Sequence, residues 1–236
     1  NLPHIPLFSS KEALGKSSRG LYGDVIEEID YGIGEILKTL KNEGLDKNTL
    51  VVFTSDNGPW TAYKDNGGSA GPLRAGKGTT WEGGMRVPTI FWLPGKISPG
   101  IINQIGSTMD LLTTFSKIAG VSIPEDRQLD SYDLGPRLFE NNPTSRNHIF
   151  YYRGNELYAV RHGEYKAHYI TRGEYGLYGG KKNHNPPLLY NLNKDASEKY
   201  NISKKHPDII RKINRIVTEH KQKMIIGKDL LIERGD

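Results

Sequence analysis

Two adjacent side chains with oxygen donors follow a short apolar run in the sequence. The run Leu50–Phe53 is apolar, mostly β-branched or aromatic, and stops at Ser55-Asp56-Asn57-Gly58. A run of this length before a turn signal predicts a buried strand of a parallel sheet, and ligands of such sheets bind beyond the carboxyl ends of the strands. The Asp56 carboxylate and the Asn57 amide oxygen are hard donors suited to Ca²⁺ or Mg²⁺. Asp-Asn-Gly is also good turn chemistry, so a plain turn is the alternative.

A lysine lies between two glycines further along the chain. Gly76-Lys77-Gly78 is followed by a second glycine pair, Gly83 and Gly84. Glycines let the backbone approach a ligand closely and reach positive φ values, and a lysine on such a loop is a point charge for an oxyanion. The Walker A pattern Gly-x-x-x-x-Gly-Lys-Ser/Thr is absent. These residues therefore predict an oxyanion-binding loop that is not a nucleotide P-loop.

The order of these motifs is more specific than either motif alone. A strand, Asp-Asn-Gly, a polar loop and Leu-Arg-x-Gly-Lys-Gly-Thr-Thr-x-Glu-Gly-Gly-x-Arg-x-Pro follow one another, and the run Phe53–Pro88 resembles the type I sulfatases of the alkaline-phosphatase superfamily, in particular the arylsulfatase A and N-acetylgalactosamine-6-sulfatase groups. The resemblance extends from Pro3-His4 to the last helix. It implies an α/β alkaline-phosphatase-like fold and a chain that corresponds to the C-terminal half of such an enzyme.

The resemblance implies roles for four residues. Asp56 and Asn57 would bind one divalent cation, Ca²⁺ in the family. Lys77 would neutralise the sulfate and contact the bridging oxygen, and His4, in a Pro-His-x-Pro segment, would assist the leaving group. A fifth residue, His184, would lie near the substrate cleft; the alternative is a loop histidine with only solvent contacts.

The nucleophile that the resemblance implies is missing from the sequence. The family uses a formylglycine made from Cys or Ser in a Cys/Ser-x-Pro/Ala-x-Arg motif, and none of the 236 residues lies in such a motif. We therefore expect the nucleophile and the remaining metal ligands on an N-terminal half that completes the enzyme, and we expect this chain alone to be inactive. The complete enzyme would hydrolyse aryl or carbohydrate sulfate esters.

The elements that must position these residues follow from periodicity and turn signals. Residues 1–140 are predicted to form the C-terminal part of the α/β catalytic domain, and residues 141–236 a subdomain with an antiparallel sheet and a final helix. Acidic residues on the first helix are predicted to form a solvated face. The predicted helices are 19–44, 110–119, 137–139 and 207–224, and the predicted strands are 50–55, 87–93, 148–152, 156–161, 164–170 and 188–192.

Composition narrows the possible partners and kinds of site. The formal charge of +5 is spread along the chain without a basic block interleaved with aromatics, so nucleic acid is not an expected partner. No apolar run is long enough to span a bilayer. With no cysteine, disulfides and thiolate metal sites are excluded.

Two alternative functions remain. One is a phosphoesterase or phosphonate hydrolase of the same superfamily, and the other is a non-catalytic module that binds sulfated glycans. The resemblance implies a lysosomal, secreted or periplasmic location and leaves a homo-oligomer open.

Overall fold

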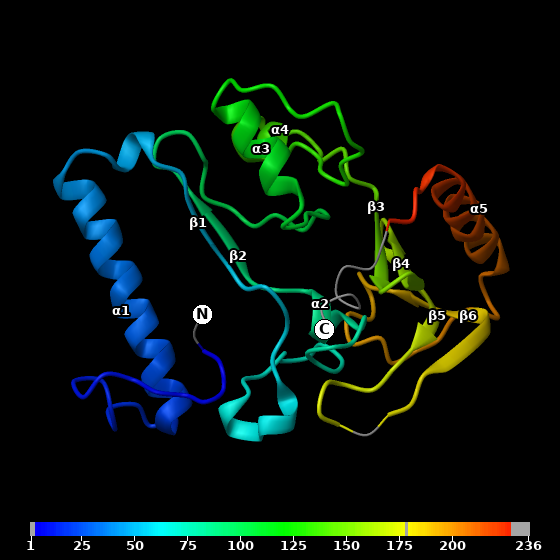
Figure 1. Ribbon diagram of the computed structural model, residues 1–236, viewed down its shortest axis with the longest axis horizontal. Helices are drawn as coiled ribbons and strands as arrows, with labels where there is room; N and C mark the ends of the chain where they lie inside the picture. The colour runs from blue at the N-terminus through cyan, green and yellow to red at the C-terminus, as the bar shows by residue number, and fades with distance from the viewer. Residues whose placement is uncertain (1–2, 178, 228–236) are drawn as a thin grey trace. The chain divides into compact units, whose positions relative to one another are not determined.

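The computed structural model describes residues 3–177 and 179–227 and divides into two compact units. The first unit comprises Asn1–Ser69 and Arg86–Arg146, and the second comprises Ala70–Met85 and Asn147–Asp236. The loop with Lys77 therefore groups with the C-terminal part of the chain (Figure 1). The domain boundary near residue 140 stays a prediction.

The first unit contains one long helix and a two-stranded sheet. Helix α1 spans Gly20–Asn42, and strands β1 (Val51–Thr54) and β2 (Thr89–Trp92) pair antiparallel, with Val51 opposite Trp92. The prediction of a buried parallel strand is therefore wrong in two respects. Among the described residues β1 pairs only with β2, and Phe53 is 40% exposed. An apolar run indicates a tendency to be buried but carries no information on the direction of pairing.

Helix α1 confirms the predicted helix, but one of its acids is not solvated. Asp24 is buried and accepts backbone N–H bonds from Gly15 at 2.8 Å and Ser17 at 2.7 Å. These bonds lower the pKa of the Asp24 carboxyl. The prediction of a wholly solvated acidic face is therefore wrong at Asp24, because the preceding turn folds back over the first turn of the helix.

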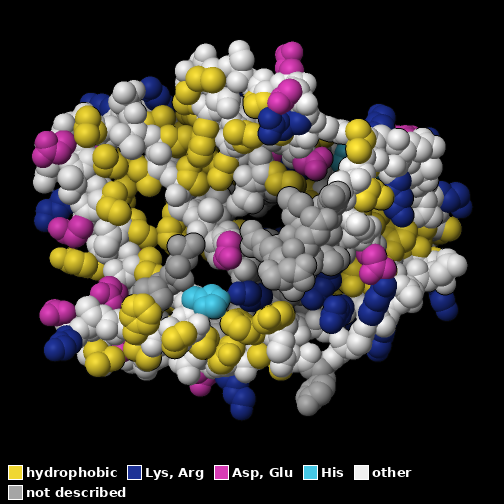
Figure 2. All heavy atoms as spheres, viewed as in Figure 1, with side chains coloured by type: hydrophobic (Ala, Val, Ile, Leu, Met, Phe, Trp, Pro, Cys, Tyr) yellow, Lys and Arg dark blue, Asp and Glu magenta, His cyan; other side chains and the backbone are white. Residues whose placement is uncertain are grey.

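The rest of the first unit is built from short elements. The 3₁₀ helices are η1 (Asp46–Asn48) and η2 (Thr61–Asn66), and the α-helices are α3 (Asp110–Ile118) and α4 (Gly135–Glu140). The carboxylate of Asp110 is buried and pairs with the buried guanidinium of Arg146. Figure 2 shows hydrophobic side chains gathered on one face of this unit. Ile90 and Leu112 are among the large hydrophobic residues of the unit that are exposed.

The second unit is a four-stranded antiparallel meander with a helix, as predicted. Its strands run in the order β3 (His148–Arg153), β4 (Glu156–His162), β5 (Tyr165–Thr171) and β6 (Lys182–Asn191). Gly154 and Gly163 turn the chain at positive φ, as their spacing predicts.

Helix α5 (Pro207–Lys223) lies along one side of this sheet (Figure 1). Its buried stripe meets the inward face of the sheet in one core, formed by Leu157, Val160, Ala167, Leu189, Ile210, Ile213 and Val217. The short helix α2 (Glu82–Met85), which the sequence did not predict, ends the loop that contains Lys77. No helix among the described residues is long and apolar enough to cross a membrane.

Candidate active site

Asp56 and Asn57 lie just beyond the end of β1, after Ser55, as the sequence predicts. The Asp56 side chain is exposed and Asn57 is half-buried. Asn57 donates from Nδ2 to the Gly58 carbonyl at 2.8 Å, and Ser55 Oγ donates to the Asn57 carbonyl at 3.0 Å. These local bonds fix the turn and leave the Asn57 side-chain oxygen and the Asp56 carboxylate as oxygen donors at the strand end.

The oxygen atoms of Asp56 and Asn57 are suitable ligands for a hard cation, but two ligands are too few to hold one. Calcium takes about six to eight oxygen ligands, several of them charged. Among residues 3–177 and 179–227, no group of three or more His, Cys, Asp or Glu side chains is arranged to hold a metal ion. Asp56 and Asn57 therefore fit as part of a metal site and require further ligands.

His4 lies beside the segment that follows the turn. Its imidazole is exposed, and Nδ1 donates to the Ile5 carbonyl at 2.8 Å. The ring centroid is 5.8 Å from that of Trp60, four residues beyond Asp56. Because a carbonyl accepts from Nδ1, the other ring nitrogen, Nε2, is the one that can exchange a proton with a ligand.

The loop with Lys77 is compact and is held by its own backbone. The half-buried Lys77 accepts, through its carbonyl, the Tyr175 N–H at 2.8 Å. Gly78 has a φ of +87°, and a Cβ at Gly83 would lie 2.1 Å from the Ala75 carbonyl oxygen. The glycines are therefore required by close packing of the loop on itself and on Tyr175.

A buried ionic cluster anchors this loop to the sheet, and it was missed in the sequence. We call Glu82, Lys166, His168 and Glu198 the Lys166 cluster; all four side chains are at most 2% exposed. Lys166 Nζ lies 2.8 Å from Glu82 Oε1 and 3.6 Å from Glu198 Oε1. The Glu82 backbone N–H donates to Glu198 Oε2 at 2.6 Å. The helix that ends the Lys77 loop is thus bound to β5 and to the segment after β6.

His168 belongs to this cluster as a neutral group. Its Nε2 lies 2.7 Å from Glu198 Oε1, and its ring centroid lies 4.1 Å from that of Trp81, with the two ring planes tilted by 37°. Burial lowers the His168 pKa to about 4 and outweighs the glutamate, which acts to raise it. The one signal available in the sequence was the i, i+2 spacing of Lys166 and His168 in a strand, which places both on one face.

His184 lies in strand β6, not in a loop. Its Nε2 is 2.8 Å from the Thr171 hydroxyl oxygen, and burial and Lys182 lower its pKa. The alternative of a loop histidine with only solvent contacts is therefore wrong, and contact with substrate stays a prediction. His4, Asp56 and Asn57 belong to the first unit, and Lys77 and His184 to the second.

Comparison with known proteins gives the same family in both parts of the chain. The family model described as Sulfatase matches residues 2–121, and the one described as the C-terminal region of aryl-sulfatase matches residues 144–235. N-acetylgalactosamine-6-sulfatase of Mus musculus is 40% identical over 252 residues, which cover 97% of this chain and 48% of that protein. Arylsulfatase A of Homo sapiens is 39% identical over 216 residues, or 84% of this chain and 42% of that protein.

A solved sulfatase structure has the same fold as this chain. A sulfatase from Pseudoalteromonas sp. superposes with a TM-score of 0.87 at 28% identity, over 95% of this chain and 48% of that one. The predicted α/β alkaline-phosphatase-like fold class is thereby confirmed. The chain spans about half the length of the curated relatives that it matches.

Proposed function

This chain belongs to the sulfatase family, and we propose that the protein is a sulfuric ester hydrolase that cleaves aryl or carbohydrate sulfate esters. The observation that carries the proposal is the joint match of both family models to one chain that also contains the Asp-Asn-Gly turn and the Gly-Lys-Gly loop. The names of the two relatives, an aryl and an amino-sugar sulfatase, support these two substrate classes.

Lys77 is proposed to bind the sulfate group. A sulfate ester reacts slowly in water because its charged oxygens repel nucleophiles, so a catalyst needs a fixed positive charge near those oxygens. The backbone bond to Tyr175 and the anchoring of Glu82 in the Lys166 cluster support a loop that is rigid before substrate binds. A charge on a preorganised loop stabilises the transition state without reorganisation at the moment of reaction.

His4 is proposed to assist the departing oxygen. It lies on a segment stiffened by prolines on both sides, Pro3 and Pro6, and its Nδ1 is already used by the Ile5 carbonyl. Nε2 is therefore the atom that would give a proton to the leaving alkoxide or phenoxide.

Asp56 and Asn57 are proposed to hold part of a divalent-cation site. A bound cation would supply Lewis-acid stabilisation of charge on sulfate oxygens. The proposed formylglycine nucleophile needs a Cys/Ser-x-Pro/Ala-x-Arg sequence, which does not occur in these 236 residues. Activity is therefore proposed for the full-length protein that supplies both that nucleophile and the further metal ligands.

Parallel assays of the full-length protein on 4-nitrophenyl sulfate and 4-nitrophenyl phosphate test the proposal. We expect turnover of the sulfate, and loss of it in Lys77→Ala but not in the matched exposed variant Lys204→Ala. A preference for the phosphate would identify a phosphoesterase instead. Binding of sulfated glycans without turnover of either ester would identify a non-catalytic module.

A further inference from the structure

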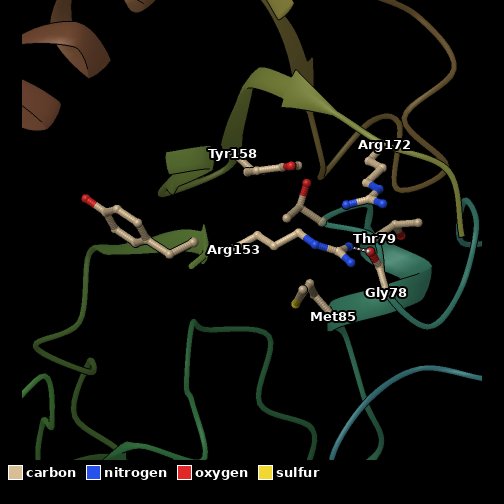
Figure 3. Close-up of a pocket in the computed structure, with 8 residues that line it drawn as sticks. Gly78, Thr79, Met85, Arg153, Tyr158 and Arg172 are labelled. Carbon is tan, nitrogen blue, oxygen red and sulfur yellow. Dashed lines mark hydrogen bonds between the residues drawn. The ribbon is translucent and has the colours of Figure 1, made fainter. Parts of the chain in front are cut away.

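A small pocket opens beside the loop that contains Lys77. Its volume is about 190 Å³, and it lies within the second unit. The turn Gly78–Thr80 forms one wall, and Tyr158 of β4, Arg153 at the end of β3 and Arg172 just after β5 form others (Figure 3). Three strands and the loop therefore contribute to one concave surface.

Two arginines line this pocket. Figure 3 shows the guanidinium groups of Arg153 and Arg172 converging on one part of it, with Arg153 directed at the Gly78 carbonyl. Arg153 donates from Nη1 to the Gly78 carbonyl at 3.2 Å, and Arg172 has no hydrogen bond or ion pair with any described residue. Among the residues that the structure describes, no carboxylate lines the pocket. By contrast, Arg161 and Arg215 of the same unit each lie 3.8 Å from a glutamate oxygen.

This arrangement has the chemistry of an oxyanion site. Two guanidinium charges on one concave surface repel each other, and an anion bound between them would offset that repulsion. A guanidinium offers a planar fork of donors that matches the paired oxygens of a sulfate or a carboxylate. The side chain of Tyr158, 4% exposed, closes one wall and limits access of water on that side.

We propose that the Arg153–Arg172 pocket binds a second anionic group of the substrate, a sulfate or a carboxylate on the sugar adjoining the scissile sulfate ester. The pocket begins at Gly78, the residue directly after Lys77, so it adjoins the residue proposed to bind the scissile sulfate. The inference rests on the proposed function and adds two residues, Arg153 and Arg172, that would select among its substrates.

Kinetics of the full-length protein test the pocket against three disaccharides that share one scissile sulfate ester. One carries no other charge, one a second sulfate and one a uronate carboxylate. In Arg153→Gln and Arg172→Gln we expect kcat/KM to fall about 10-fold for the two dianionic substrates and to stay within about 2-fold for the monoanionic one. The control Arg211→Gln, an exposed arginine on α5, removes the same charge outside the pocket and should change none of them.

The identity of the anion follows from which substrate is affected. A loss confined to the disulfated or to the uronate substrate identifies a sulfate or a carboxylate subsite, respectively. Equal losses on the monoanionic and dianionic substrates, or losses no larger than in Arg211→Gln, overturn the proposal. Because Arg172 has no partner among the described residues, Arg172→Gln should keep its wild-type melting temperature, so its result is not confounded by unfolding.

Binding measurements separate failure of the pocket from failure of the proposed function. Calorimetry at constant ionic strength would use a sulfate-free uronate disaccharide and a disaccharide with a non-hydrolysable sulfonate. An increase of about 10-fold in the Kd for at least one probe in both pocket variants supports the subsite, even if the protein hydrolyses no sulfate ester. Wild-type affinity of both variants for both probes overturns it, even if sulfatase activity is present.

Discussion

Replacing Glu82 by glutamine would remove one negative charge from the Lys166 cluster and keep the size of the side chain. Lys166 is fully buried, and its ammonium lies 2.8 Å from Glu82 Oε1. The second carboxylate, Glu198, is 3.6 Å away and is also bonded to His168. After the substitution Lys166 would have only this more distant, shared counter-ion.

The expected loss follows from the burial of the pair. Removing one partner of a buried ion pair destabilises a protein by about 3–5 kcal/mol, because the other charge is left uncompensated. Glu198 compensates part of that charge, so we expect the free energy of unfolding to fall by an amount near the lower end of this range, about 3 kcal/mol. The Glu82 backbone bond to Glu198 survives the change, so the loop should loosen without unfolding.

Hydrogen exchange of the buried β5 amides, Ala167 among them, would measure this loss within the second unit. The matched control is Glu156→Gln, which removes the same charge from a pair with Lys181 whose side chains are 52% and 41% exposed. That pair should contribute less than about 1 kcal/mol. An equal effect of the two substitutions would refute the role of the Lys166 cluster.

A double-mutant cycle would show whether the charge itself is the cause. In the Glu82→Gln background, Lys166→Met should cost less than in the wild type, since the charge that it removes is already poorly compensated. Additive losses would mean that Glu82 does not act through the charge of Lys166, and would leave its pair with Arg161 and its packing as the causes. If the cluster holds the Lys77 loop, kcat/KM for a sulfate ester should fall in Glu82→Gln and not in Glu156→Gln.

Three further predictions concern the metal, the leaving group and pH. Calorimetry should show weak or no Ca²⁺ binding by the 236-residue chain, because two donors are too few, and Asp56→Ala should abolish Ca²⁺ binding in the full-length protein; tight binding by the chain alone would contradict this. His4→Ala should lower kcat by about 10²–10⁴ for esters of weakly acidic alcohols and less for acidic phenols; parallel plots of log kcat against leaving-group pKa would exclude leaving-group assistance. The His168 pKa is depressed to about 4 in the folded state, so the unfolded chain binds more protons and stability should fall as pH drops from about 6.5 toward 4; His168→Gln should flatten that part of a urea-denaturation pH profile.

Periodicity and turn chemistry predicted most elements but not how the first two strands pair. Helix α1 and the β3–β6 meander follow from the spacing of their apolar residues and from glycines at turns. The strand at Leu50–Phe53 was also found, but its antiparallel pairing with β2 depends on residues 35 or more positions away. The local pattern records burial tendency and cannot record the partner.

Local sequence patterns could not predict the buried charged residues, for a different reason. Asp24, Lys166 and Glu198 have the residue types of a solvated surface, and each is buried only because a distant or preceding segment supplies its partner. The bond from the Glu82 backbone to Glu198 spans 116 residues. No periodicity within a helix or strand encodes such a pairing, so these residues become visible only when the chain is folded.

The Gly-Lys-Gly-Thr-Thr-Trp-Glu-Gly-Gly run therefore combines two kinds of requirement. Lys77 is the residue whose charge suits a sulfate, whereas Glu82 is a buried counter-ion and Gly83 has no room for a Cβ beside the Ala75 carbonyl. A motif recognised as one unit is thus in part a binding element and in part its support. Substitutions of the supporting residues should change stability and loop position together, whereas Lys77→Ala should change sulfate binding with little effect on stability, because its half-buried side chain lies outside the Lys166 cluster.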